Sequence, residues 1–86
     1  MSDYRPIDCS VYDQYELAIM RRRRLMLGWR DEAGFARLDR VSPVDLRTRD
    51  GEEFLVFVNS AGEQLAVRLD RILEFRDAQA GAREPG

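Results

Sequence analysis

The chain of 86 residues contains no histidine and no lysine, so all 14 of its basic residues are arginine. The lack of histidine removes the most frequent physiological-pH base and metal ligand of proteins. Cys9 is the only cysteine, which excludes an internal disulfide and is typical of a reducing compartment. No apolar run approaches the roughly 18 to 20 residues that span a bilayer, and the polar N-terminus is unlike a secretory signal. We therefore expect a cytoplasmic protein that does not act in a membrane.

Patterns that carry catalysis or hold a cofactor are also missing. Cys9 has no histidine to activate it as a nucleophile. The acid pairs Asp31-Glu32 and Glu52-Glu53 fall in predicted turns, where we interpret them as solvated loop charge rather than as acid–base groups. No phosphate loop, zinc pattern or calcium loop is visible. The sequence predicts no catalytic residue, no cofactor, no metal site and no enzyme activity.

The charge is unevenly distributed along the chain. The formal net charge is −2, but four of the 14 basic residues form one run, Arg21 to Arg24. Without this run, ten arginines stand against 16 acids and the net charge is −6. Overall acidity argues against non-specific binding to nucleic acid, which depends on basic residues meeting phosphates.

One helix is predicted, over about residues 10–21. Ser10 is a candidate N-cap, and Asp13 follows three residues later in a spacing like that of a capping box. Arg21 and Arg22 complement the dipole at the other end. Apolar side chains fall on one helical stripe that is wide enough to lie on a sheet: Val11, Tyr12, Tyr15, Ala18 and Ile19.

The remaining apolar segments predict short strands. They alternate or are rich in β-branched residues and are joined by tight turns, over residues 25–29, 35–41 with a second piece at 44–48, 53–58, 64–69 and 72–75. Pro43 cannot donate to a ladder, so it predicts a bulge, an edge or a bend. Strands joined this tightly are antiparallel. We therefore expect a mainly β fold: a small five-stranded antiparallel barrel of the Sm-like or SH3-like type, with an N-terminal helix.

A single domain is expected over residues 1–77. A chain of this length buries only about 60% of its unfolded surface, so its core must be compact. We expect Trp29, Phe54 and Phe57 to lie in that core. Residues 78–86 are small and polar, and we expect them to form a disordered tail.

Two charged features remain open to a functional or a structural interpretation. Asp13 and Glu16 are three residues apart, so they neighbour each other on the helix, either as ordinary solvated acids or as a partner contact. The run from Arg21 to Arg24 either closes the helix and enters the first strand or binds RNA. The residues alone indicate a small binding module.

Several stretches together resemble the Rho-binding antiterminator family, called Rof, whose members inhibit Rho-dependent transcription termination in bacteria. The resemblance spans roughly residues 4–75 in the family's order. It lies in Tyr4-Arg5-Pro6-Ile7-Asp8-Cys9, Tyr12-Asp13, Glu16-Leu17-Ala18, Leu25-Met26-Leu27, Asp45-Leu46, Phe54-Leu55-Val56, Ala61-Gly62-Glu63 and Arg68-Leu69-Asp70-Arg71-Ile72.

This resemblance implies an N-terminal helix on an Sm-like barrel. It also implies a partner, the N-terminal RNA-binding domain of the Rho hexamer, and a block on the entry of RNA. Asp13 and Glu16 are carried over as the leading contact residues, with Tyr12 beside them, and Arg49 and Asp50 in a turn are a weaker carry-over. On this basis we expect a monomer that binds Rho without contacting nucleic acid or membrane. The alternative is an Sm-like RNA-binding protein that uses Arg21 to Arg24.

Overall fold

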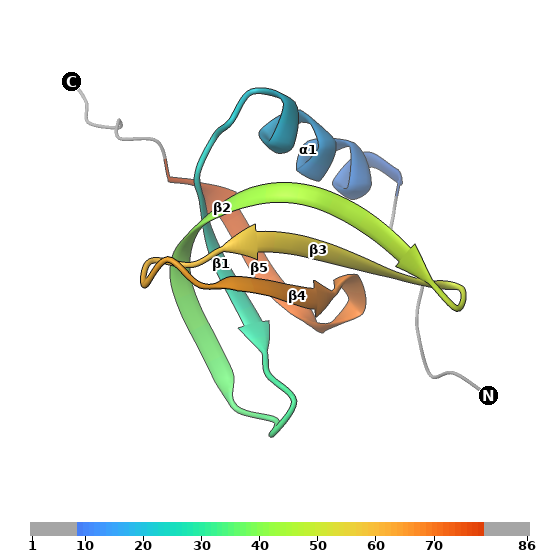
Figure 1. Ribbon diagram of the computed structural model, residues 1–86, viewed down its shortest axis with the longest axis vertical. Coiled ribbons are helices and arrows are strands. Elements are labelled where there is room, and N and C mark those ends of the chain that lie inside the picture. The colour runs from blue at the N-terminus through green and yellow to red at the C-terminus, as the bar shows by residue number, and fades with distance from the viewer. Residues whose placement is uncertain (1–8, 79–86) are drawn as a thin grey trace.

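The computed structural model describes residues 9–78, which form one α-helix followed by five strands and a short 3₁₀ turn (Figure 1). The mainly β fold with one N-terminal helix is thus confirmed. The disordered tail that we expected from residue 78 lies, from residue 79 onward, outside the described residues.

The helix α1 spans Cys9–Met20 and so begins one residue before the expected start. Ser10 is therefore inside the first helical turn, and our prediction that it is the N-cap is wrong, because an N-cap residue has a non-helical backbone. The first turn holds no acid and the last turn no base. Asp13 is consequently not part of a capping box, and Arg21 lies just beyond the helix.

The C-terminus of α1 ends in a Schellman motif built without glycine. The Arg23 N–H donates to the Ala18 carbonyl at 2.9 Å, and the Arg22 N–H donates to the Ile19 carbonyl at 3.2 Å. These two bonds satisfy carbonyls that a helix end leaves without partners. The motif requires a left-handed residue at its turning point, and Arg22 occupies it with a φ of 55°. A residue with a Cβ is strained there.

The strands form one antiparallel sheet in the order β4-β3-β2-β1-β5. Their bounds are β1 Leu25–Arg30, β2 Ala36–Arg49, β3 Glu52–Val58, β4 Gln64–Arg68 and β5 Ile72–Asp77, with a 3₁₀ turn η1 at Leu69–Arg71. Within the described residues the edge strands β4 and β5 form no ladder with each other, so the sheet is not closed. The expected barrel is therefore an open one.

The long strand β2 joins the two halves of the sheet. Its N-terminal half pairs with β1 and its C-terminal half with β3, so it arches across the molecule beneath α1 (Figure 1). The register shifts between Pro43 and Asp45, which confirms the irregularity that Pro43 predicted. The two segments expected on either side of Pro43 are thus one bent strand.

The core lies between α1 and the concave side of the sheet. Tyr15 of α1 packs on Phe75 of β5 with ring centroids 4.8 Å apart, and Trp29 meets Phe57 at 5.2 Å. The helical stripe is confirmed, since Tyr15 and Ala18 are buried and their apolar neighbours pack against the core. Phe54 is only half-buried, so our placement of it in the core is wrong. Ten residues form the buried cluster: Tyr15, Ala18, Leu25, Leu27, Trp29, Val41, Leu55, Phe57, Val67 and Leu69.

Candidate functional site

The predicted contact residues of the helix lie on its outer side. Asp13 and Glu16 are exposed, and Tyr12 is half-buried at the edge of the core. Packing against the core fixes the ring of Tyr12, while the two carboxylates project from a helix that is itself held by buried Tyr15 and Ala18. The helix therefore presents these acids on a rigid support.

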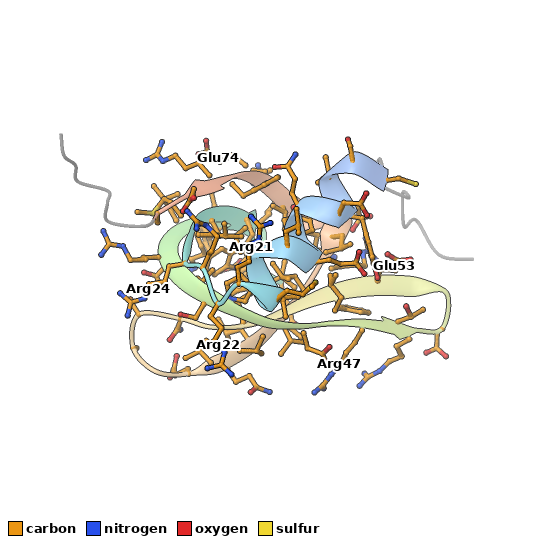
Figure 2. The ribbon with its side chains drawn as sticks, turned by 90° about the horizontal axis from the view of Figure 1, so that it is seen from above. Arg21, Arg22, Arg24, Arg47, Glu53 and Glu74 are labelled. Carbon is orange, nitrogen blue, oxygen red and sulfur yellow. The ribbon has the colours of Figure 1, made fainter. Side chains whose placement is uncertain are left out.

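Carboxylates from the sheet join this helix surface. The pKa of Tyr12 is raised, first by burial and then by the negative charges of Glu53, Glu16 and Asp45. Carboxylates from β3, α1 and β2 are therefore close enough to act on one hydroxyl, which stays protonated at neutral pH. We call Asp13, Glu16, Asp45 and Glu53 the acidic surface. Figure 2 shows Glu53 toward the end of the molecule where α1 begins.

The register of the sheet explains why Glu53 lies there. Leu46 pairs with Leu55 beneath the helix, and Thr48 pairs with Glu53 two residues further along the same face. Our interpretation of Glu52 and Glu53 as loop charge is thus wrong, because both lie in β3. Sequence spacing offers no signal for this placement, since the position of Glu53 relative to α1 depends on a register between distant segments.

The other two predicted residues lie at the tip of the β2–β3 hairpin. Arg49 pairs with Glu52, which leaves Asp50 and Gly51 as a two-residue loop. Both have positive φ, 53° and 80°, as a type I′ turn requires. Asp50 in this tip is three residues before Glu53 in the sequence.

The four arginines of the basic run have different surroundings. Arg23 donates from Nε to the Asp77 carboxylate at 3.0 Å and so fastens the segment between α1 and β1 to the end of β5. Arg21 and Arg22 belong to the helix terminus described above. Arg24 precedes β1, and its carbonyl accepts the Ala78 N–H at 2.9 Å. Arg22 and Arg24 lie toward the opposite end of the molecule from Glu53 (Figure 2).

A groove of about 870 Å³ lies between the β1–β2 hairpin and strands β3 and β4. Trp29, Phe54 and Leu65 contribute apolar walls. Its charged walls are largely paired: Arg37 bonds Asp31 at 2.8 Å, and Arg68 bonds Asp70 at 2.6 Å. The sequence interpretation placed no site residue in this groove.

Within residues 9–78 no three metal-ligating side chains come together. No helix of these residues is long and apolar enough to cross a membrane. Cys9 is an exposed free thiol at the start of α1.

Comparison with known proteins gives both a family match and a structural likeness. The model of a family described as "Modulator of Rho-dependent transcription termination (ROF)" matches residues 6–83. The protein named rof in Escherichia coli K12 and that in Shigella flexneri are each 36% identical over 78 residues, covering 91% of this chain and 87% of the relative. The solved structure of proteasome accessory factor B/C of Arthrobacter aurescens is similar with a TM-score of 0.75 at 18% identity. The likeness covers 91% of this chain and 13% of that one, and it concerns the fold alone.

Proposed function

Because the chain belongs to the Rof family of modulators of Rho-dependent transcription termination, we propose that it binds the N-terminal RNA-binding domain of Rho and blocks the loading of RNA. The family description is a regulatory role rather than a catalytic one. In this proposal the protein acts as a monomeric antiterminator in the cytoplasm, where Rho meets the transcript.

The acidic surface is the observation that supports this proposal. A surface that binds RNA is positively charged, because it must neutralise phosphates. Carboxylates from three elements, Glu16, Asp45 and Glu53, act on Tyr12 and offer such a surface a complementary charge, with Asp45 also paired to Arg47. Complementary charge steers the encounter and fixes the register of a complex. A protein that occupies this region of Rho excludes the RNA that would bind there.

Tyr12 gives the proposed interface a rigid apolar contact at its centre. Tyrosine is enriched among residues that carry binding energy, because its ring buries much area and its hydroxyl pairs with polar groups. Tyr12 already packs against the core, so its side chain loses little further freedom on binding. We place Arg49 and Asp50 at the rim of the interface, where charge affects the association rate more than the dissociation rate.

The decisive experiment compares two double charge reversals that change the net charge equally. Asp13→Lys with Glu16→Lys alters the proposed contact, while Glu32→Lys with Glu63→Lys alters exposed acids in two other turns. We expect the first variant to bind purified Rho at least about thirtyfold more weakly, which corresponds to about 2 kcal/mol. The control is expected to stay within about threefold of the wild type. Affinity is measured by biolayer interferometry on variants whose folding is checked by circular dichroism.

A competition assay tests the mode of inhibition. Labelled oligocytidine is bound to Rho and the unlabelled protein is titrated in. We expect displacement by the wild type and by the turn control, and none by the helix variant at the same concentrations. Undiminished Rho binding by the folded helix variant would exclude the acidic surface as the contact. Binding of Rho without displacement of oligocytidine would exclude the proposed block on RNA loading.

A further inference from the structure

The strand β4 has a free edge that borders the groove described above. β4 pairs with β3 on one side, and within residues 9–78 no strand pairs with its other side. Figure 1 shows the β1–β2 hairpin extending past this free side. Four consecutive residues of β4, from Leu65 to Arg68, line the groove. Since neighbouring residues of a strand point to opposite faces, a groove that touches all four follows the edge of the strand rather than one face.

The hydrogen bonding of the β3–β4 hairpin directs backbone groups of Ala66 to this edge. The Asn59 N–H donates to the Glu63 carbonyl at 2.8 Å, so these two residues form a hydrogen-bonded pair. Along an antiparallel ladder such pairs alternate with pairs that exchange no bonds. Leu65 and Phe57 therefore bond each other, while Ala66, the next residue, does not bond β3. The N–H and C=O of Ala66 are directed away from β3, and the residue is exposed.

The other edge strand carries more protection against pairing than β4 does. β5 contains Glu74, Arg76 and Asp77, and a bulge interrupts its register with β1. Charged side chains and bulges are devices that keep an exposed edge from pairing. β4 has a regular register along its whole length, and its one charged residue, Arg68, is held by Asp70 at 2.6 Å. Its short length of five residues is the remaining protection.

The groove has room for one added strand. A strand of five residues with its side chains fills about 800 Å³, given about 3.3 Å per residue, about 4.8 Å between paired strands and about 10 Å between sheets. The groove measures about 870 Å³. With the β1–β2 hairpin as its far wall, it suits a single extended segment better than the edge of a second copy, whose whole sheet would follow its strand.

The walls of the groove favour particular side chains in such a segment. Leu65 and Val67 present apolar side chains on the core side of β4, next to Trp29. In all, five acids and four arginines line the groove. Beside the paired arginines described above, three of these acids form no ion pair within residues 9–78: Glu32, Asp39 and Glu63. Arg30 and Arg71 donate to backbone carbonyls. The excess of carboxylates favours basic over acidic side chains.

We propose that the free edge of β4 binds an extended segment of another protein, with alternating apolar and basic residues, by adding it to the sheet as a further strand. Main-chain hydrogen bonds to Ala66 hold the backbone, and the groove walls select the side chains. The residue that bonds Ala66 has its side chain on the exposed side and is basic, while its neighbours face the side of Leu65 and Val67 and are apolar.

This edge is separate from the acidic surface, none of whose residues lines the groove. The proposal is tested without Rho, so its failure leaves the proposed function unaffected. The probe is a fluorescein-labelled peptide with blocked ends in which valine and lysine alternate over about seven residues, an ordinary strand length. Fluorescence anisotropy with the full chain measures its affinity.

Two methylated forms of the peptide test the backbone contact. One carries N-methyl groups on the lysine amides and the other carries them on the valine amides, so the two forms are equally stiffened. Successive residues of a strand direct their N–H groups to opposite edges. We therefore expect methylation at the lysines to weaken binding at least about tenfold, and methylation at the valines to leave it within about threefold.

Ala66→Pro removes the same contact from the protein. Proline here breaks no bond of the β3–β4 ladder, because the Ala66 N–H is directed away from β3, and we expect at least about tenfold weaker binding of the unmethylated peptide. Ala36→Pro is the matched control. The Asp31 N–H donates to the Phe35 carbonyl, so the next residue, Ala36, does not bond β1, and it does not line the groove. This control is expected to bind within about threefold of the wild type, and circular dichroism checks both folds.

The charge of the segment is tested with a peptide that has glutamate in place of lysine. We expect it to bind severalfold more weakly than the lysine peptide, with a larger difference at low salt. Several results would overturn the proposal: equal effects of the two methylated peptides, no binding of the unmethylated peptide at about 1 mM, or equally tight binding of single-stranded oligouridine. Dimerisation of the chain in sedimentation that Ala66→Pro abolishes would assign the edge to a second copy and overturn it as well.

Discussion

Glycine substitutions at two neighbouring arginines after α1 are expected to change stability in opposite directions. Arg22, the left-handed residue, gains stability and Arg21 loses it. Arg22 has a φ of 55°, which costs a residue with a Cβ roughly 1–2 kcal/mol. Glycine removes this strain but loses about 0.5–1 kcal/mol more backbone entropy on folding. The Arg22→Gly substitution is therefore expected to stabilise the protein by about 0.5–1 kcal/mol. At about 4–8 °C per kcal/mol for a domain of this size, the Tm rises by roughly 2–8 °C.

Arg21→Gly is the matched control, since it removes the same charge one residue earlier. Arg21 continues the helical hydrogen bonding, with its N–H on the Leu17 carbonyl at 2.9 Å. Glycine relieves no strain there, and its entropy loss lowers stability by about 0.5–1 kcal/mol. Urea unfolding followed by circular dichroism at 222 nm, roughly the wavelength of helix absorption, measures both variants. If Arg22→Gly is no more stable than Arg21→Gly, the left-handed turn does not carry the strain that we assign to it.

Three further substitutions test other parts of the fold. Gly51→Ala introduces a Cβ at a φ of 80° without any close contact, so urea unfolding is expected to show a purely conformational loss of about 1–2 kcal/mol. Leu27→Ala empties a fully buried site and is expected to cost about 3–5 kcal/mol in the same measurement; a loss below about 1 kcal/mol would contradict the packing described. The Ser60 N–H holds the pKa of Asp39 below 3.8, so this carboxylate stabilises the fold above that pH and ceases to do so as pH falls through its lowered pKa. Asp39→Ala is thus expected to be less stable than the wild type at neutral pH, with a difference that shrinks on acidification to about pH 2.

Local sequence patterns predict the order of the elements, but they do not predict whether the sheet closes into a barrel. Alternation and turn residues located the strands, and Pro43 marked the bulge in β2, because these signals depend on neighbours in sequence. The predicted helix of about residues 10–21 is shifted by one residue from Cys9–Met20, since the spacing of Ser10 and Asp13 resembles a capping box but does not fix where the helix begins. Whether β4 and β5 pair depends on the curvature of the whole sheet, which no local pattern encodes.

The candidate site also has one part that the sequence indicates and another part that only the fold brings together. Resemblance and helical spacing indicated Asp13 and Glu16, whereas Glu53 and Asp45 join them only through the pairing of β2 with β3 and the packing of Tyr12. Arg40 and Arg76 are a stronger example of such placement, because they are 36 residues apart in sequence and both pair with Met26. A run such as Arg21 to Arg24 is conspicuous in a sequence, while a row assembled from three strands is not.

Under the proposed function, this arrangement explains how a protein with so many arginines approaches a basic partner. Asp13 and Arg21 are eight residues apart, about 12 Å along a helix axis, which exceeds the Debye length of about 8 Å at physiological ionic strength. Glu16 is closer to Arg21, at about 7.5 Å along the axis. Arg23 is neutralised by Asp77, and Arg24 lies toward the end of the molecule away from Glu53. The basic run therefore subtracts little from the field at Asp13 and Glu53, and Arg21 acts mainly on Glu16. It follows that replacing Arg21 and Arg24 together by glutamine changes Rho affinity by less than about threefold at 150 mM salt, roughly the ionic strength of the cell, and more strongly as salt is lowered. A large loss of affinity at physiological salt would mean that these arginines contact the partner directly.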